Sequence, residues 1–276
     1  MGAITAGLLV TALLVAAGGT AATAERNSSA SSASAATVTP EADPSVAPSI
    51  ELTGELPVLE PPEPPPAPEP PPPPPPPVYR VGDSGPEVKM IEQRLADLRY
   101  DVQNVDGVYD ETTSHAVMAF QKVHGLGRDG STGPETLGVL SKASGLPDPM
   151  VPFGSPDRVE VDVERQVVFL YLGGELAKII SASTGSLEIF CEGGSCRRAV
   201  TPNGDFSVTR RYTGWEKGDL GRLYNPLYFN QGIALHGSES VPGYPASHGC
   251  VRLPMATAEW LPSVVPNGMS VHVLNA

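Results

Sequence analysis

The spacing of apolar residues along this chain changes near residue 155. Before that point, apolar residues recur every three or four positions in three segments, 84–98, 112–123 and 132–140, which predicts three amphipathic helices. Ser84 and Thr132 each precede a proline by two residues and a glutamate by three, so each is a predicted N-cap within a capping box. We therefore expect a small three-helix bundle in this part of the chain.

After residue 155 the apolar pattern has the period of two that is typical of strands. Every second residue of 158–163 is valine and the intervening residues are charged, as in a strand with one polar face. Segments 167–172 and 176–182 are apolar, and Gly173-Gly174 between them predicts a hairpin turn. Further strands are predicted at 204–209, 232–236 and 269–274, and one helix at 254–261. The pattern predicts a mainly β domain, a sandwich or open barrel with one short helix, so the whole chain is expected to be multidomain.

The segment 25–77 has the composition of a disordered linker. Residues 25–56 are rich in Ser, Ala, Thr and Pro, and fifteen of the 31 prolines lie between Pro57 and Pro77. Because proline lacks a backbone donor and has a fixed φ, we expect this run in extended polyproline II rather than in a helix or sheet. We interpret it as a spacer; a ligand for proline-binding domains is the alternative.

The first 24 residues predict export. Residues 3–19 are mostly apolar, and Ala22-Thr23-Ala24 matches the cleavage pattern of a signal peptide. No Lys or Arg precedes the apolar run, which is atypical of a signal peptide, so an uncleaved membrane anchor is the alternative. In either case the remaining chain is expected outside the cytoplasm, in the cell wall or periplasm-equivalent space, secreted or held to the membrane only by this segment.

The formal net charge of −13 is concentrated in the linker. Residues 25–77 carry eight acidic side chains and one basic side chain, whereas 155–276 carry twelve acidic and ten basic ones. The parts expected to fold are therefore close to neutral. They lack the basic surface that nucleic-acid binding requires, so we expect no nucleic-acid partner.

The chain has three cysteines, Cys191, Cys196 and Cys250. Cys191 and Cys196 are separated by a glycine-containing segment that can bring the two sulfur atoms together, so we predict a disulfide between them. Cys250 is then a free thiol in an oxidising compartment, which indicates a chemical role. A zinc site made of the three cysteines with His236 or His248 is the alternative; it requires reduced thiolates, which is at odds with export.

The residues around Cys250 have the composition of a nucleophile site. His236-Gly237 ends a predicted strand, and a Gly/Pro/Ser-rich loop leads from it to Ser247-His248-Gly249-Cys250-Val251-Arg252. A thiol close to an imidazole loses its proton more readily, and the thiolate is the nucleophile. Successive backbone N–H groups at such a turn can hold a developing oxyanion.

The helical segment resembles the peptidoglycan-binding domain family 1, a three-helix module. The resemblance rests on Leu95, Leu98-Arg99-Tyr100, Asp106-Gly107-Val108-Tyr109, Thr112-Thr113, Ala116-Val117, Phe120-Gln121, Gly125-Leu126, Asp129-Gly130, Gly133 and Thr136. Arg99 and Asp110 replace two glycines of the family pattern. The resemblance implies that residues 78–145 bind wall polymer; a helical spacer without a ligand is the alternative.

Residues 158–274 resemble the L,D-transpeptidase (YkuD-type) catalytic domain. The resemblance rests on Ser247-His248-Gly249-Cys250-Val251-Arg252, on the preceding His236-Gly237 and on Thr201-Pro202-x-Gly204-x-Phe206. It implies that Cys250 is the nucleophile and His236 the base, and that the carbonyl of Gly237 orients the His236 ring. It further implies that His248 and Arg252 line the site and that the amides of Gly249 and Cys250 form the oxyanion hole.

The resemblance also implies the substrates and the domain limits. Peptidoglycan stem peptides and glycan are the implied partners, and no metal or organic cofactor is required. Candidate substrate-binding residues are Ser247, Tyr228 and Phe229, with core packing as the alternative for the two aromatic residues. The implied reaction releases D-Ala from a tetrapeptide donor and forms a 3→3 cross-link.

Two other functions stay open at this stage. Water can take the acyl group instead of an amine, which would make the protein an L,D-carboxypeptidase, and a non-catalytic wall-binding protein is a further alternative. The predicted organisation is a signal or anchor at 1–24, a linker at 25–77, a binding module at 78–145 and a catalytic domain at 155–276 of a monomer.

Overall fold

The computed structural model describes residues 73–275. The predicted signal or anchor at 1–24 and most of the linker at 25–77 lie outside the described residues; residues 73–77 form neither helix nor strand. In the part of the chain that the structure describes, no helix has the length and apolar character needed to cross a membrane.

Three helices precede the first long strand, in the segments where the apolar spacing predicts them. They are α1 (Pro86–Asp97), α2 (Glu111–Val123) and α3 (Pro134–Lys142). The predicted capping boxes are wrong: Gly85 and Gly133 occupy the N-cap positions and no side chain caps either helix. Each helix instead begins at a proline, whose missing N–H would have no partner in the first turn.

The structure shows the local setting of the two departures from the family pattern of the helical segment. Arg99 has a φ of 69°, in the left-handed region that glycine adopts most readily, so this backbone conformation accounts for the glycine of the family pattern and not for the arginine. Asp110 is the N-cap of α2, because its carboxylate accepts a hydrogen bond from the backbone N–H of Thr113 at 2.8 Å.

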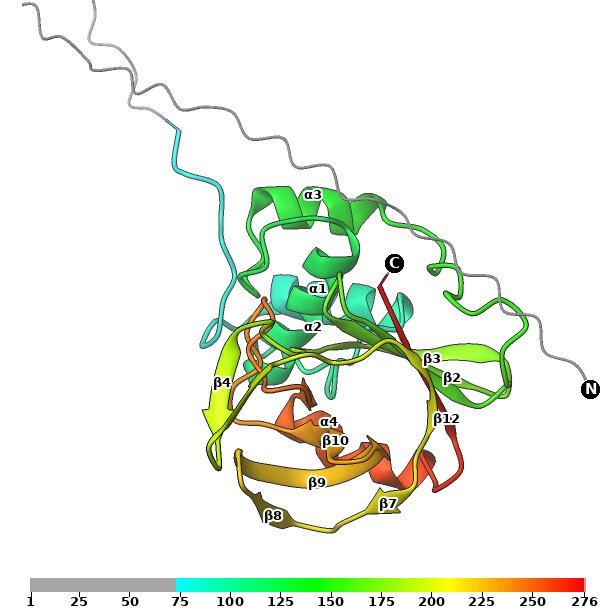
Figure 1. Cartoon of the computed structure of the whole chain (residues 1–276). Coiled ribbons are helices and arrows are strands. Elements are labelled where there is room, and N and C mark those ends of the chain that lie inside the picture. Colours follow the sequence, from blue (N-terminus) through cyan, green and yellow to red (C-terminus); the bar gives the residue numbers. More distant parts are fainter. Residues whose placement is uncertain (1–72, 276) are drawn as a thin grey trace, which may run out of the picture. The chain divides into compact units, whose positions relative to one another are not determined.

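The strands form two five-stranded sheets and one separate hairpin (Figure 1). The first sheet has the order β3-β2-β1-β12-β6 and contains both termini of the β part, because β1 pairs in parallel with β12. The second has the order β11-β10-β9-β7, with β8 also paired to β9, and β4 pairs only with β5. The strand bounds are β1 (Arg158–Asp162), β2 (Val167–Leu172), β3 (Glu175–Ser181), β4 (Ile189–Glu192), β5 (Ser195–Arg198), β6 (Gly204–Ser207), β7 (Arg210–Arg211), β8 (Trp215–Gly218), β9 (Gly221–Asn230), β10 (Ile233–Gly237), β11 (Val251–Leu253) and β12 (Ser270–Leu274).

The fourth helix, α4 (Met255–Val264), packs against the second sheet. It begins one residue after the predicted start and continues three residues beyond the predicted end, through Pro262. The β part of the chain is therefore mainly β with one short helix, and the described residues contain four helices in total.

Strand β2 is buried on both faces, which explains why its sequence is a continuous apolar run. Val168 and Leu170 belong to the cluster that fills the space between the two sheets. Val167, Phe169 and Tyr171 belong to a second cluster, which also contains residues of α1, α2 and α3. The helices therefore cover the outer face of the first sheet, and the helical and β parts share one hydrophobic cluster.

The edge of the first sheet is closed by the chain that follows α1. The backbone N–H of Asp101 donates to the carbonyl of Ile179 at 3.0 Å, and the N–H of Ile179 donates to the carbonyl of Arg99 at 2.8 Å. The Asp101 carboxylate also accepts a hydrogen bond from Thr257 of α4 at 2.6 Å. An edge strand left open is prone to pair with other chains, so this contact protects β3.

A buried lysine also connects the two parts. The Nζ of Lys122 on α2 donates to the Oγ of Ser181 and to the carbonyl of Ala182, both at 2.8 Å. Burial, with a smaller contribution from Arg128, lowers the pKa of Lys122 to about 7. The two hydrogen bonds satisfy an ammonium group that burial would otherwise make costly.

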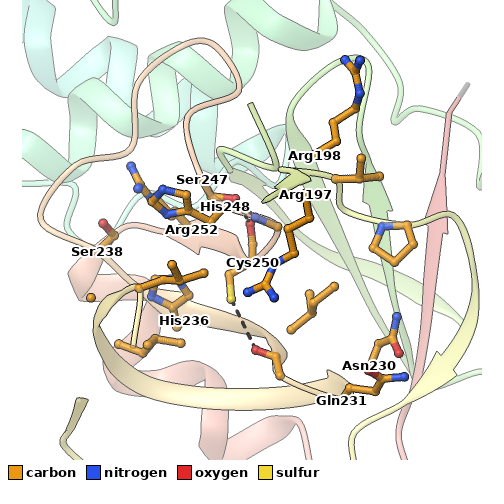
Figure 2. Close-up of a pocket in the computed structure, with 18 of the residues that line it drawn as sticks. Arg197, Arg198, Asn230, Gln231, His236, Ser238, Ser247, His248, Cys250 and Arg252 are labelled. Carbon is orange, nitrogen blue, oxygen red and sulfur yellow. Dashed lines mark hydrogen bonds between the residues drawn. The ribbon is translucent and has the colours of Figure 1, made fainter. Parts of the chain in front are cut away.

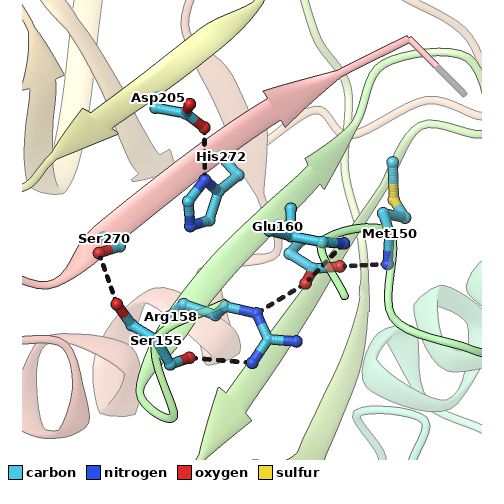
Figure 3. A network of polar contacts seen from close by, with 8 residues as sticks. Met150, Ser155, Arg158, Glu160, Asp205, Ser270 and His272 are labelled. Atoms are coloured by element: carbon cyan, nitrogen blue, oxygen red, sulfur yellow. Dashed lines mark hydrogen bonds and ion pairs between the residues drawn. The ribbon is translucent and has the colours of Figure 1, made fainter. Parts of the chain in front are cut away.

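The strand predicted from the alternation in 158–163 is present as β1, and its charged residues are not exposed. All five residues of β1 are buried, and Glu160 is fully buried with its charge paired (Figure 3). The Nε of Arg158 donates to Glu160 at 2.7 Å, and the backbone N–H of Met150 donates to the other carboxylate oxygen at 2.9 Å. The segment before the strand thus covers the face that carries the charged side chains.

Candidate active site

The strand that ends in His236-Gly237 and the strand that follows Cys250 lie side by side in the second sheet. Strand β10 ends in His236-Gly237, and β11 begins one residue after Cys250. The two strands are parallel neighbours, with His236 directly opposite Arg252. His236, His248, Cys250 and Arg252 line one open cavity of about 660 Å³ (Figure 2). The structure therefore brings together four residues that the sequence predicts to act together.

His236 is held rigidly and is neutral. His236 is only 6% exposed, and its Nδ1 lies 2.8 Å from the carbonyl oxygen of Gly237. Burial lowers the pKa of His236 to about 4; the Gly237 hydrogen bond acts in the opposite direction, and the nearby Arg252 lowers it further. With a proton on Nδ1 donated to that carbonyl, Nε2 keeps a free lone pair and is the basic atom of the ring.

Cys250 is a free, partly exposed thiol whose sulfur atom faces the cavity. Its Sγ lies 3.8 Å from the carbonyl oxygen of Gly232, and this contact is the dashed line in Figure 2. Burial raises the pKa of the Cys250 thiol, while a backbone contact at Ala234 and the charge of Arg252 lower it. Because burial is the largest effect, the thiol and the imidazole are both neutral before substrate binds.

The turn before Cys250 is fixed by its own side chains. Ser247 donates from Oγ to the carbonyl of Cys250 at 2.5 Å and accepts a hydrogen bond from the N–H of Gly249 at 3.0 Å. Gly249 has a φ of 140°, and a Cβ there would lie 2.9 Å from the carbonyl oxygen of Val200. Glycine is therefore required at this position, because any other side chain would meet the backbone at Val200.

These contacts bear on two predicted roles. The N–H of Gly249 donates to Ser247, whereas the N–H of Cys250, the other predicted oxyanion donor, has no hydrogen-bond partner within 73–275. Ser247 borders the cavity, but it is buried and its hydroxyl is used within the turn. Ser247 therefore holds the turn before Cys250 in place.

Tyr228 and Phe229 do not border the cavity. Phe229 lies in the cluster between the two sheets, with its ring centroid 5.6 Å from that of Phe206. Tyr228 is buried, and its hydroxyl donates to Glu216 at 2.8 Å. The alternative of core packing describes both residues, because they lie in the buried stretch 225–229 of β9.

The predicted disulfide between Cys191 and Cys196 is confirmed, with an S–S distance of 2.04 Å. The two residues are directly opposite each other in the β4–β5 hairpin. This hairpin contacts the Cys250 loop, because the rings of Phe190 and His248 meet edge to face at 4.8 Å between centroids. Since the disulfide uses two of the three sulfur atoms, it leaves no set of three thiolates for the alternative zinc site.

Three charged residues that the sequence reasoning missed also border the cavity. Arg197 and Arg198 come from β5, and Arg222 comes from β9. The signal in the sequence is weak: a pair of arginines next to Cys196, and a single arginine in a segment without clear alternation. Their placement depends on hairpins β4–β5 and β8–β9, which the sequence pattern did not predict.

The fold is mainly β, with a free cysteine and a buried histidine in one cavity, and comparisons with known proteins identify the family of the chain. Residues 156–273 match the L,D-transpeptidase catalytic domain, and residues 84–140 match a peptidoglycan binding domain. The crystal structure of an L,D-transpeptidase from Xylanimonas cellulosilytica is 41% identical, with a TM-score of 0.67, and the match covers 74% of this chain and all of that one. The chain therefore belongs to the L,D-transpeptidase family, and a peptidoglycan-binding domain precedes its catalytic domain.

Two weaker similarities complete the comparison. An L,D-transpeptidase structure from Stackebrandtia nassauensis is 24% identical with a TM-score of 0.43, over 71% of this chain and 95% of that one. N-acetylmuramoyl-L-alanine amidase CwlM of Mycobacterium tuberculosis is 42% identical over 53 residues, which are 19% of this chain and 13% of the amidase. The chain thus spans only a small part of that curated relative, and the amidase activity in its name is not carried over.

Proposed function

We propose that this protein joins peptidoglycan stem peptides by L,D-transpeptidation, with Cys250 as the nucleophile. The observation that supports this most directly is the meeting of Cys250, His236 and Arg252 in one cavity of an L,D-transpeptidase domain. In the proposed reaction, Cys250 attacks the carbonyl of the third residue of a tetrapeptide donor. The bond to the terminal D-Ala breaks, and a thioester remains on the enzyme.

The proton path follows from the neutral state of both groups. As Sγ leaves the Gly232 carbonyl and attacks, the thiol proton passes to Nε2 of His236, and the same ring then protonates the departing amine of D-Ala. The Nδ1 contact with Gly237 keeps the ring in the required tautomer throughout. An acceptor amine then attacks the thioester, gives its proton to His236 and regenerates the thiol as the 3→3 cross-link forms.

The N-terminal part of the chain is proposed to deliver this domain to the wall. Residues 78–145 form a three-helix module that binds wall polymer, in line with the family match at 84–140. Residues 1–24 act as a signal or an anchor and 25–77 as a spacer, so that the domain at 155–276 works as an exported monomer. The shared hydrophobic cluster supports a module that is held rigidly against the catalytic domain rather than on a flexible connection.

The test is to incubate the purified protein with a tetrapeptide donor, with and without an acceptor stem peptide, and to determine the masses of the protein and the products. We expect a thioester adduct on Cys250, release of D-Ala and a cross-linked dimer when the acceptor is present. Cys250→Ala should give neither adduct nor dimer. Cleavage of D-Ala with only hydrolysed tripeptide as product would identify a carboxypeptidase, and an unchanged donor would contradict the proposal.

A further inference from the structure

The Thr201-Pro202 segment carries part of the family resemblance, and none of the reaction steps proposed above uses it. Val200 and Pro202 border the cavity, whereas Thr201 between them does not and is only 3% exposed. Thr201 is therefore a buried polar side chain behind one wall of the candidate active site. Buried polar groups in folded proteins are hydrogen-bonded, so the partners of this hydroxyl indicate what it holds in place.

The Thr201 hydroxyl joins two segments that are distant along the chain. Its Oγ1 donates to the carbonyl oxygen of Gly249 at 2.7 Å and accepts a hydrogen bond from the backbone N–H of Gly185 at 2.9 Å. Both glycines are needed for this close approach. A Cβ at Gly185 would clash with the carbonyl oxygen of Ala199, and a Cβ at Gly249 would lie 2.9 Å from that of Val200. Because Gly185 is the donor in its own bond, the single hydroxyl proton of Thr201 is available to Gly249.

This hydrogen bond fixes the orientation of the peptide bond between Gly249 and Cys250. In a trans peptide, the usual form, the C=O and the following N–H lie in one plane and point in opposite directions. The Gly249 carbonyl points to the buried Thr201, so the N–H of Cys250 points away from it. Gly249 and Cys250 border the cavity and Thr201 does not, so this is the side of the turn that faces the cavity (Figure 2).

The other contacts of the turn leave this peptide unit free to rotate. Ser247 holds the N–H of Gly249 and the carbonyl of Cys250, which belong to the peptide units on either side. Within 73–275 the Thr201 hydroxyl is the only hydrogen-bond partner of the unit that joins Gly249 to Cys250. Because Gly249 has no Cβ and adopts a φ of 140°, sterics alone restrict its backbone little.

We propose that Thr201 is a positioning residue of the oxyanion hole: by holding the Gly249 carbonyl, its hydroxyl keeps the N–H of Cys250 directed at the oxyanion that forms during acylation. This inference rests on the proposed transpeptidation and adds a residue to the same site. In the step concerned, Sγ of Cys250 bonds to the carbonyl carbon of the donor, and the π electrons of that C=O move to its oxygen. The thiol proton passes to His236, and the N–H of Cys250 donates to the oxyanion until it collapses and the bond to the D-Ala nitrogen breaks.

The experiment compares two reactions of the same thiol, of which only one forms an oxyanion. Acylation by the tetrapeptide donor forms one, whereas alkylation by iodoacetamide joins Sγ of Cys250 to a CH₂ carbon as iodide leaves and forms none. Both rates are measured for the full chain, for Thr201→Val, which replaces the hydroxyl by a methyl group, and for Thr201→Ser, which keeps the hydroxyl. Thr132→Val is the matched control, because Thr132 is a buried threonine whose hydroxyl is hydrogen-bonded to Tyr109 and which does not border the cavity.

We expect Thr201→Val to lower the acylation rate at saturating donor by about 10- to 100-fold, less than the loss of an oxyanion donor outright, with KM nearly unchanged. Alkylation by iodoacetamide should keep its native rate in Thr201→Val, because no oxyanion forms. Thr201→Ser and Thr132→Val should keep the native ratio of the two rates. Thr201→Ala, which removes the same hydroxyl with a smaller side chain, repeats the test if the tryptophan fluorescence of Thr201→Val shows an unfolded protein.

Three results would overturn the inference while leaving transpeptidation itself intact. They are an unchanged acylation rate without the Thr201 hydroxyl, an equal loss in acylation and alkylation, and a selective loss of acylation in Thr201→Ser. Failure of the native protein to acylate with the donor, while iodoacetamide still alkylates Cys250, would instead refute the proposed function.

Discussion

The shared hydrophobic cluster predicts that the helical part and the catalytic part unfold together, and Phe120→Ala is the variant that tests this. Phe120 lies on α2 and is 0% exposed. Its ring meets that of Tyr100 edge to face at 5.4 Å, in the cluster that also contains Phe169 and Ile179 of the first sheet. Replacing a buried phenylalanine by alanine costs about 3–5 kcal/mol, through lost burial and the cavity that remains.

The two parts of the protein can be followed separately during thermal unfolding. The two tryptophans of the chain, Trp215 and Trp260, both lie in the β part, so their fluorescence reports on the catalytic domain. Far-UV circular dichroism reports mainly on the helices, most of which lie before residue 143. For a folded part of this size, we expect Phe120→Ala to lower the midpoint of both signals equally, by about 6–20 °C.

The control is Phe153→Ala, because Phe153 is fully exposed at 107% and its removal should leave both midpoints within about 2 °C of the native value. A lower midpoint in circular dichroism with an unchanged fluorescence midpoint would refute the reasoning, because it would mean that the helices unfold independently. If the reasoning holds, deleting the helical module uncovers apolar residues of β2 and β3. Wall binding must then be tested with point variants of the intact chain.

Three further predictions concern the site itself. His236→Ala should lower the rate of single-turnover acylation of Cys250 by about 10²–10⁴-fold, with partial recovery at high pH. His248→Ala should lower this rate less, and a larger loss in His248→Ala than in His236→Ala would reverse the two roles. Burial lowers the pKa of His236 to about 4, and a base must be unprotonated, so the rate of acylation should stay constant as pH falls from 7 to 5 and decline only near pH 4. A decline centred near pH 6.5 would contradict the buried, neutral ring. Replacing both Cys191 and Cys196 by Ser should raise KM for the donor more than it changes kcat, because the β4–β5 hairpin borders the cavity but does not contain Cys250. An unchanged KM would show that the disulfide has no part in holding the donor.

The sequence by itself determined features whose cause is local along the chain. Three helices appear where apolar residues recur every three or four positions, because this spacing places them on one face of a helix. The Cys191–Cys196 pair could be predicted because the four residues between the two cysteines, two of them glycines, suffice to form the hairpin that closes it. The motif that ends in Cys250-Val251-Arg252 identified the family by its order alone.

Other features depended on which distant segments meet, and no local pattern contains that information. Glu160 stands in an alternating strand, yet it is buried because Arg158 and the backbone of Met150 neutralise and cover it. The sequence of β2 is apolar on both faces, but only the tertiary structure shows that one face belongs to the helices.

At the site, the sequence identified the residues, and the tertiary structure determined their burial, protonation and hydrogen bonding. The low pKa of His236 comes mainly from burial, which depends on everything packed around the ring, and the N–H of Gly249 is occupied because the turn folds Ser247 back onto it. Arg197 of β5 and Arg222 of β9 come from two different hairpins, and only the folded chain places both at the border of one cavity. Burial, protonation and the charge of a cavity are set by atoms that are neighbours in space, and for this protein only the tertiary structure decides which atoms those are.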